Sequence, residues 1–455
     1  MNALATRRKL GDVGVLPLLA MAELMLTVDL SIVNVALPAI RGDLRFSQSS
    51  LQWVVNGYAL TFAGFLLLGG RAADLFGGRR VFLGALSVFS VASLACGLAT
   101  EAAALVAARA VQGLSAGVVA PATLSMLTAT YREPEARNRA LAIWTAAAIG
   151  GASVGGLLGG VLTGALSWRW IFFVNVPVGA ALVALGAARL PRADADSAAN
   201  ELDLAGAVTV TSGLTALVWA LIRSGEAGWS SADVVGGLTA SAALLALFVL
   251  LETRVARAPL VPFTVFRSRL LSAGNRLSFL SFVPVMATWF FLTLYLQGVR
   301  GYTPTETGLW FLPMSLAVAG GSQVSFRVIS RLDARELFLA GGLIAAAGMA
   351  WLGRLAAGTD PVWVIVPASV AMAGGGLMFA PITVAATSGV PPERGGLASG
   401  LLNTTRQIGG ALGLAVLGTI AADAGYATAL DVGAATFVAT AIAGAIALPA
   451  RIRQR

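Results

Sequence analysis

Long apolar runs separated by short polar segments follow one another along the whole chain. Each run is about twenty residues long, the length that a helix needs to cross the hydrocarbon core of a bilayer. A helix suits that core because it satisfies its backbone hydrogen-bonding groups within its own segment. The pattern predicts an all-α integral membrane protein with about fourteen transmembrane helices. The predicted spans are 13–38, 49–69, 81–99, 103–128, 139–163, 169–188, 205–223, 233–252, 273–297, 306–327, 335–357, 361–386, 396–421 and 426–449.

The basic residues between these runs gather on one side of the predicted membrane. About 22 of the 31 lie on the side of the N-terminal tail, against about 6 on the other. Loops rich in Lys and Arg stay in the cytoplasm, so the pattern predicts a multi-pass protein of the cytoplasmic (inner) membrane with both termini inside. The cytoplasmic set includes Arg7, Arg8, Lys9, Arg132, Arg192, Arg394, Arg451, Arg453 and Arg455.

The chain also repeats itself. Three matches share a shift of about 257 to 260 residues, which relates spans eight helices apart. Two parallel six-helix bundles separated by two inserted central helices would give this pattern. We expect an N-terminal bundle over 1–190, linker segments with the two inserted helices over 191–270, and a C-terminal bundle over 271–455. The matches are Ala120–Thr123 with Ala380–Thr383, Ile149–Ala152 with Ile408–Ala411, and Trp53 with Trp310.

The amino-acid composition limits which metal sites, disulfides and proton-carrying groups the protein can contain. Hydrophobic residues make up 57% of the chain and charged residues 12%, whereas a soluble domain is about a quarter charged. Cys96 is the only cysteine and histidine is absent. An internal disulfide and a cysteine-based metal cluster are therefore excluded, and carboxylates must carry any transported protons.

Other classes of partner are disfavoured as well. The net charge of +9 does not indicate nucleic-acid binding, because the arginines lie in short loops between apolar runs. Lys9 is the only lysine and no G-x-x-x-x-G-K-[ST] loop is present, which excludes direct use of ATP by this chain. We expect no metal, no cofactor and no enzymatic activity. A proton gradient is the remaining energy source.

Several motifs together resemble one known family. The sequence is similar to the major facilitator superfamily and, within it, to the fourteen-helix drug:proton antiporter family. Two departures stand out: Gly156 replaces the proline usual after the second glycine of the antiporter motif, and the signature loop has Ala72 and Gly78 at positions where Leu and a basic residue are usual. The matching segments are Asp29–Pro38, Gly70–Arg80, Arg109–Gly113, Gly151–Gly160, Trp168–Pro177 and Gly400–Gln407.

Asp29 is the leading candidate for proton coupling. A carboxylate inside a membrane span is costly and is by default a candidate functional group. Counted at 1.5 Å per residue, Asp29 lies roughly 22 Å from the cytoplasmic edge, and Arg109 in the fourth span lies at nearly the same level. We expect Arg109 to neutralise Asp29 in one state and to release it when a proton or a cationic cargo binds. The alternatives are a fixed structural carboxylate and an arginine tied only to backbone carbonyls.

Glu23 is an accessory acid on the same helix. Six steps of about 100° place it on a different face from Asp29. It lies at about the level of Arg406, roughly 13 to 15 Å from the cytoplasmic edge. Two environments are open: contact with Arg406 across a central cavity, or hydration at the inner vestibule, which we favour.

The signature loop is predicted to act as a conformational switch. Asp74 is expected in a short cytoplasmic turn, where it caps a helix and pairs with an arginine. An ordinary solvated turn is the alternative. The loop residues are Gly70, Asp74, Gly77, Arg79 and Arg80.

The antiporter motif carries glycines at a spacing that favours a helix contact. Gly151, Gly155 and Gly159, with the adjacent Gly160, recur along one helix and allow a second helix to approach closely. The resemblance implies that this contact seals the outer path, and plain packing is the alternative.

Polar groups of the second half are candidates for a substrate cavity. Apolar walls with a few polar groups suit amphiphilic cargo better than sugars. Polar groups satisfied between helices are the alternative. The candidates are Tyr295, Gln297, Gln323, Asn403 and Arg406.

These observations predict a proton-coupled antiporter that exports small amphiphilic or cationic compounds. Its partners would be the lipid bilayer, protons and a small-molecule substrate, and we expect a monomer. One alternative is a dedicated exporter or importer of a single metabolite or antibiotic. A membrane receptor or embedded enzyme is disfavoured, because the chain offers few groups from which to build a catalytic site.

Overall fold

A computed structural model describes residues 2–131, 133–190, 202–257, 259–354, 360–388 and 395–449. Within these ranges, fourteen helical segments are long and apolar enough to cross a membrane, and no strand is present. The predicted all-α membrane fold with fourteen spans is confirmed. Part of the predicted linker, 191–201, lies outside the described residues, as do Arg132, Arg192, Arg394, Arg451, Arg453 and Arg455.

The spans are built from sixteen α-helices and four short helical turns. The elements are α1 (Asn2–Leu44), η1 (Ser50–Gln52), α2 (Trp53–Phe76), α3 (Gly78–Leu98), α4 (Ala102–Thr130), α5 (Pro134–Ala165), α6 (Trp170–Phe173), α7 (Asn175–Arg189), α8 (Leu204–Ala227), α9 (Ala232–Leu250), η2 (Leu251–Val255), η3 (Phe263–Arg267), α10 (Arg269–Leu294), η4 (Tyr295–Val299), α11 (Pro304–Val328), α12 (Ala334–Gly353), α13 (Pro361–Leu377), α14 (Phe379–Thr387), α15 (Gly395–Ala424) and α16 (Tyr426–Ala447). The α6–α7 pair forms one crossing, and α13–α14 forms another.

Local sequence signals set several helix ends. The Thr303 side chain accepts a hydrogen bond from the Glu306 backbone, and the Glu306 carboxylate accepts one from the Thr303 backbone, so a capping box starts α11. Asp203 and Ser231 cap α8 and α9 in a similar way. Gly77 has a φ of 86°, a conformation that ends α2 and that glycine adopts without strain.

The two halves of the chain pack their helices in the same order. α1 packs on α5 as α10 packs on α15; α2 packs on α4 as α11 packs on α13; and α3 packs on α7 as α12 packs on α16. Each pairing recurs eight spans later, the displacement that the internal matches predict. The proposed division at residues 190 and 270 stays a prediction.

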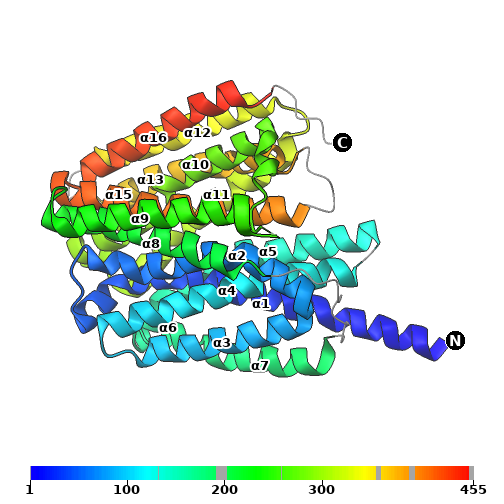
Figure 1. Ribbon diagram of the computed structural model, residues 1–455. Helices are drawn as coiled ribbons and strands as arrows, with labels where there is room; N and C mark the ends of the chain where they lie inside the picture. Colours follow the sequence, from blue (N-terminus) through cyan, green and yellow to red (C-terminus); the bar gives the residue numbers. More distant parts are fainter. Residues whose placement is uncertain are drawn as a thin grey trace.

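The halves meet along two helix pairs and an inserted helix. α5 contacts α11, and α2 contacts α15. The inserted helix α8 packs against both α2 and α15, and α9 packs against α8. Figure 1 shows the blue and cyan helices on one side, the yellow and red helices on the other, and α8 and α9 between them in this view. α1 begins and α16 ends at the same end of the bundle, which we call the terminal end; the opposite end is the far end.

Candidate functional site

A buried ion pair lies inside the N-terminal half of the molecule. The Arg109 Nη1 donates to the Asp29 Oδ2 at 2.8 Å, and both side chains have no solvent exposure. Asp29 comes from α1 and Arg109 from α4, so the structure brings together the two residues that the sequence places at one depth. A charge pair without water around it depends on good geometry and on further hydrogen bonds.

Two amides complete the environment of the Asp29 carboxylate. Gln112 Nε2 donates to Asp29 Oδ1 at 2.8 Å, and Asn175 Nδ2 donates to the same oxygen at 2.7 Å. Both amides also donate to the Ser93 hydroxyl, which in turn donates to the backbone carbonyl of Phe172. Four helices, α1, α3, α4 and α7, therefore supply one connected polar cluster.

Arg109 is held on several sides. Its Nε donates to the Val54 carbonyl at 3.1 Å, and its Nη1 also donates to Gln112 Oε1 at 2.7 Å. The guanidinium carbon lies 4.3 Å from the centre of the Tyr58 ring, within range of a cation–π interaction. Its Nη2 is buried without a hydrogen-bond partner among the described residues. The side chain therefore has carbonyl contacts as well as the carboxylate, and one donor remains unused.

Gln112, Asn175 and Ser93 were not predicted as functional residues. Gln112 follows Arg109 by three residues on α4, so both side chains lie on one helix face. Asn175 lies in the segment Trp168–Pro177, which the family resemblance already singles out. A polar amide inside an apolar span was the sequence feature that could have marked these residues as functional. That both amides donate to one carboxylate follows only from the packing of four helices.

Glu23 has neither of the two expected environments. The residue is only 7% exposed, which does not fit a group in an open vestibule, and it forms no ion pair with Arg406 within the described ranges. Its Oε2 is buried without a hydrogen-bond partner there. Equal depth along two helices places groups at one level, but it does not determine the direction of their side chains.

The signature loop is mostly helix, which corrects the predicted turn. α2 continues seven residues past the predicted span end at 69, to Phe76, so Gly70 and Asp74 lie on the helix and Gly77 alone forms the turn. Asp74 is exposed and accepts a long hydrogen bond from the Ser125 hydroxyl, at 3.5 Å. It does not cap α3, whose N-terminus follows Gly77 without a side-chain cap. A helix can continue past its apolar run because charged side chains there reach towards water.

The basic pair of the signature loop lies at the start of α3. Arg79 Nη2 donates to the Ala187 carbonyl of α7 at 2.6 Å, and Arg80 is exposed. Arg79 thus joins α3 to α7 at the terminal end. This contact is to a backbone carbonyl and not to Asp74, so the pairing of this loop's acid with an arginine stays a prediction.

The antiporter glycines contact two different helices. Gly151, Gly155 and Gly159 face α1, where a Cβ atom at Gly155 would lie 2.9 Å from the Val28 carbonyl and would overlap the Ser31 hydroxyl. Gly160 faces the start of α11, where a Cβ would overlap the Pro304 backbone. Neighbouring positions on a helix are about 100° apart, which is why Gly159 and Gly160 meet different helices.

Gly156, at the position where proline is usual, also faces α11. A Cβ atom there would lie 3.7 Å from the Phe311 side chain, and the backbone of Gly156 lies 2.7 Å from a Cβ built on Gly308. The Thr305 hydroxyl donates to the Gly160 carbonyl at 3.0 Å. The motif therefore joins the two halves of the molecule near the far end, in addition to packing α5 on α1.

The predicted cavity residues do not form one group. Tyr295 and Gln297 lie in η4 at the far end, where Gln297 Nε2 donates to the Val35 carbonyl of α1 at 2.7 Å. Asn403 and Arg406 lie on α15, much nearer the terminal end. Asn403 is exposed, and Gln323 on α11 is exposed as well. Gln297 thus joins the two halves, whereas Asn403 and Gln323 have exposed polar side chains.

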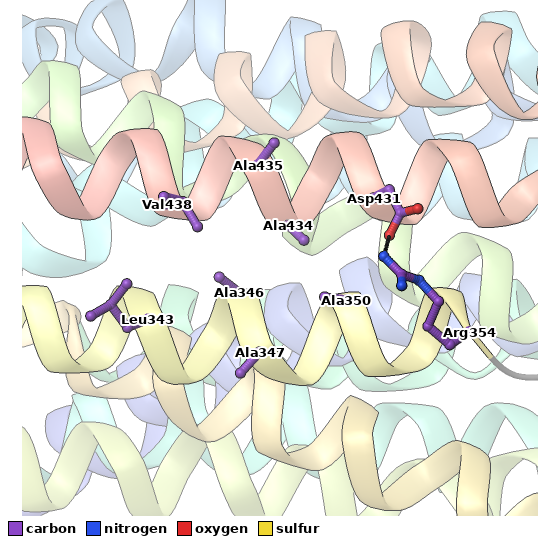
Figure 2. A pocket seen from close by; sticks show the side chains of 9 residues that line it. All are labelled: Leu343, Ala346, Ala347, Ala350, Arg354, Asp431, Ala434, Ala435 and Val438. Atoms are coloured by element: carbon purple, nitrogen blue, oxygen red, sulfur yellow. Dashed lines mark hydrogen bonds and ion pairs between the residues drawn. The ribbon is translucent and has the colours of Figure 1, made fainter.

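Two hollows lie elsewhere. One, of about 530 Å³, is a groove between α12 and α16, walled by alanines such as Ala346, Ala350 and Ala434. Figure 2 shows that it ends at the ion pair between Arg354 and Asp431, whose atoms are 3.4 Å apart. The other, of about 290 Å³, lies at the far end among η1, α8, α10, α15 and α16. Neither is lined by a residue that the sequence predicts for the site.

The chain is similar to a large group of known proteins. The sequence profile of the Major Facilitator Superfamily matches residues 19–414. The cephamycin export protein CmcT of Amycolatopsis lactamdurans is 45% identical over 88% of this chain and 83% of its own. The puromycin resistance protein of Streptomyces alboniger is 40% identical over 90% and 82%. The multidrug resistance protein Stp of Mycobacterium tuberculosis is 37% identical over 88% and 74%.

The fold has a solved counterpart. The crystal structure of a D-xylose-proton symporter superimposes with a TM-score of 0.70 over 96% of this chain and 98% of its own, at 13% identity. At this identity the likeness concerns the fold alone.

Proposed function

The chain belongs to the major facilitator superfamily, and from this premise we propose that it exports small amphiphilic compounds across the cytoplasmic membrane in exchange for protons. The relatives named for cephamycin export and for puromycin resistance support export of antibiotic-like cargo. The observation that carries the proton-coupling part is the fully buried pair of Asp29 and Arg109.

In this proposal Asp29 is the proton-binding group. When its carboxylate is ionised, Arg109 and the amides of Gln112 and Asn175 stabilise the charge through three hydrogen bonds. When a proton neutralises the carboxylate, the attraction for Arg109 disappears and its guanidinium is left with the Val54 carbonyl and Gln112. An arginine without a counter-charge is costly in a membrane span, so the helices that hold it are driven to rearrange.

The glycine motif supports an assignment of conformation. The close contacts of α5 with α11, at Gly156 and Gly160, lie in the far half of α5, whereas a Cβ added at Gly150 meets nothing within 4 Å. With the basic loops and both termini in the cytoplasm, the far end faces outward. The structure then corresponds to a state closed to the outside along this helix pair.

Dye efflux from cells tests the proposal. Wild-type protein and Asp29→Asn are expressed in a drug-sensitive bacterium, and efflux of a cationic dye is followed with and without a proton uncoupler. We expect uncoupler-sensitive efflux in the wild type and its loss in Asp29→Asn. Asp43→Asn is the matched control, because Asp43 lies on the same helix but is exposed and pairs with Arg169 at the far end. Efflux that persists with the uncoupler, or full activity of Asp29→Asn, would refute proton coupling through this residue.

A narrower exporter is the second candidate. Several relatives are named for single antibiotics, among them a tetracenomycin C resistance and export protein of Streptomyces glaucescens. Growth inhibition by a chemically diverse panel separates the two: a dedicated exporter protects against one compound class, and a multidrug exporter protects against several.

A further inference from the structure

Arg406 is a cation in a membrane span without an acidic partner. Among the described residues it forms no ion pair, and its only hydrogen bond to another side chain is a long one, from Nη2 to the Thr383 hydroxyl at 3.4 Å. Its Nε is buried and has no partner within the same ranges. Nε and Nη2 form the side-on fork of a guanidinium, which matches the two oxygens of a carboxylate.

Two aromatic rings flank this guanidinium. Its carbon lies 4.6 Å from the centre of the Phe379 ring and 5.5 Å from that of Phe282. Such contacts stabilise a cation only partly, and an arginine cannot shed its charge by losing a proton. Arg109, which is fully buried in a span, has Asp29 as its counter-ion. Among the described residues, Arg406 therefore has no counter-ion.

Arg406 lies on α15, a helix of the C-terminal half that also contacts α2 of the N-terminal half. One face of α15 contacts α10, through Thr405 and Gly409. A face about 100 to 140° around the helix contacts α2, where the Thr404 hydroxyl donates to the Ala63 carbonyl. A third face packs on α8, where the Thr419 hydroxyl donates to a backbone carbonyl.

The remaining face of α15 carries the exposed Asn403. Arg406 lies about 60° around the helix from it, at 100° per residue. The neighbours of Arg406 are Phe282 of α10 and Thr383 and Phe379 of α14. Transporters built from two repeats hold cargo where the repeats meet, and α15 contacts the other half through α2.

We propose that Arg406 binds an oxyanion of an amphiphile, with Phe282 and Phe379 packing against the apolar part that carries it. The oxyanion is either a carboxylate of the cargo or the phosphate of an anionic lipid. The cargo form of this inference rests on the proposed export function and defines its substrate class: an aromatic or apolar body with a carboxylate. Asn403 supplies a neutral hydrogen-bonding group beside the charged one.

A matched pair of dyes tests the charge requirement. Rhodamine B has a free carboxylate, and its ethyl ester has the same ring system without it. Binding of both dyes to purified protein in phosphatidylcholine vesicles is measured by fluorescence anisotropy, for the wild type, Arg406→Gln, Arg406→Lys and the control Arg276→Gln. Arg276 is exposed on α10 and donates to the Ser272 carbonyl of its own helix.

We expect Arg406→Gln to weaken rhodamine B binding about tenfold or more and the ester less than about twofold. Arg406→Lys should recover part of the loss, because it keeps the charge but not the fork. The control should bind both dyes as the wild type does. Equal losses for acid and ester would show that Arg406 only holds helices together, and would overturn the proposal.

The lipid source is distinguished by adding phosphatidylglycerol. If the site takes the cargo carboxylate, the preference for the acid persists in both lipid compositions. If it takes lipid phosphate, the wild type shows no preference for the acid, and anionic lipid raises the thermal stability of the wild type but not of Arg406→Gln. Absence of both effects refutes the proposal. These readouts use binding, so a failure of proton-driven efflux in the Asp29 test would refute the export function without deciding this one.

Discussion

Removing either partner of the Asp29–Arg109 ion pair should lower both the stability and the transport activity of the protein by amounts that can be measured. Asp29→Asn keeps the oxygen that accepts from Gln112 and Asn175 but removes the counter-ion of Arg109. Arg109→Met leaves the carboxylate with two amide donors and no cation. Removing one partner of a buried ion pair costs about 3–5 kcal/mol, because the other charge stays buried and uncompensated.

The double variant Asp29→Asn/Arg109→Met separates pairing from packing. It removes both charges, so its loss of stability should fall short of the sum of the single losses by about 2 kcal/mol. Reversible unfolding in mixed micelles, with urea or an anionic detergent as denaturant, measures the four free energies of the cycle. Costs that simply add would refute the idea that the two charges stabilise each other.

Transport gives the second half of this test. All three variants should lose uncoupler-sensitive efflux. Asp29→Asn and the double variant lack the carboxylate, even though the stability of the double variant is partly restored, and Arg109→Met lacks the cation that protonation is proposed to release. Recovery of proton-driven efflux in the double variant would show that the pair is only a structural tie.

Three further predictions concern packing and the backbone. Gly155→Ala should lower the melting temperature and efflux, because its Cβ would lie 2.9 Å from a backbone carbonyl of α1, whereas Gly150→Ala, with nothing within 4 Å, should be neutral in both assays. Gly77→Ala should destabilise the protein by about 1–2 kcal/mol, because Gly77 has a φ of 86°. Gly84→Ala on α3 is the control, since a Cβ at Gly84 meets nothing within 4 Å. Equal melting temperatures of the two variants would contradict the predicted backbone strain at Gly77. Glu252→Gln should lower the free energy of unfolding by about 1–3 kcal/mol, because Glu252 accepts backbone hydrogen bonds of 3.2 and 3.1 Å from the segment that leads to α10. An unchanged free energy of unfolding would show that those bonds contribute little.

Hydrophobic length alone was enough to locate the membrane spans. The free energy of placing apolar residues in lipid depends on each run of sequence separately, so the fourteen spans could be counted before any contact was known. Depth could be counted in the same way, at a fixed rise per residue, and this is why Asp29 and Arg109 were matched correctly.

Direction around each helix axis was decided by the tertiary structure. Glu23 and Arg406 were predicted at one depth but form no ion pair among the described residues, whereas Gln112 and Asn175, from distant parts of the chain, both donate to Asp29. Side-chain direction in a membrane bundle depends on which helices pack together, and apolar surfaces facing lipid or another helix look alike in sequence.

Helix ends near the membrane surface were also decided by context. The apolar run of the second span stops near residue 69, yet α2 continues to Phe76 and Asp74 is helical. The number of spans and the predicted depth of each charge could be read from the amino-acid order alone, because they depend on local transfer energies and a constant helical rise. The partners of those charges, and of the glycines of α5, were decided by packing between helices far apart in the chain, because only that packing selects one rotation of each helix from many of similar hydrophobicity.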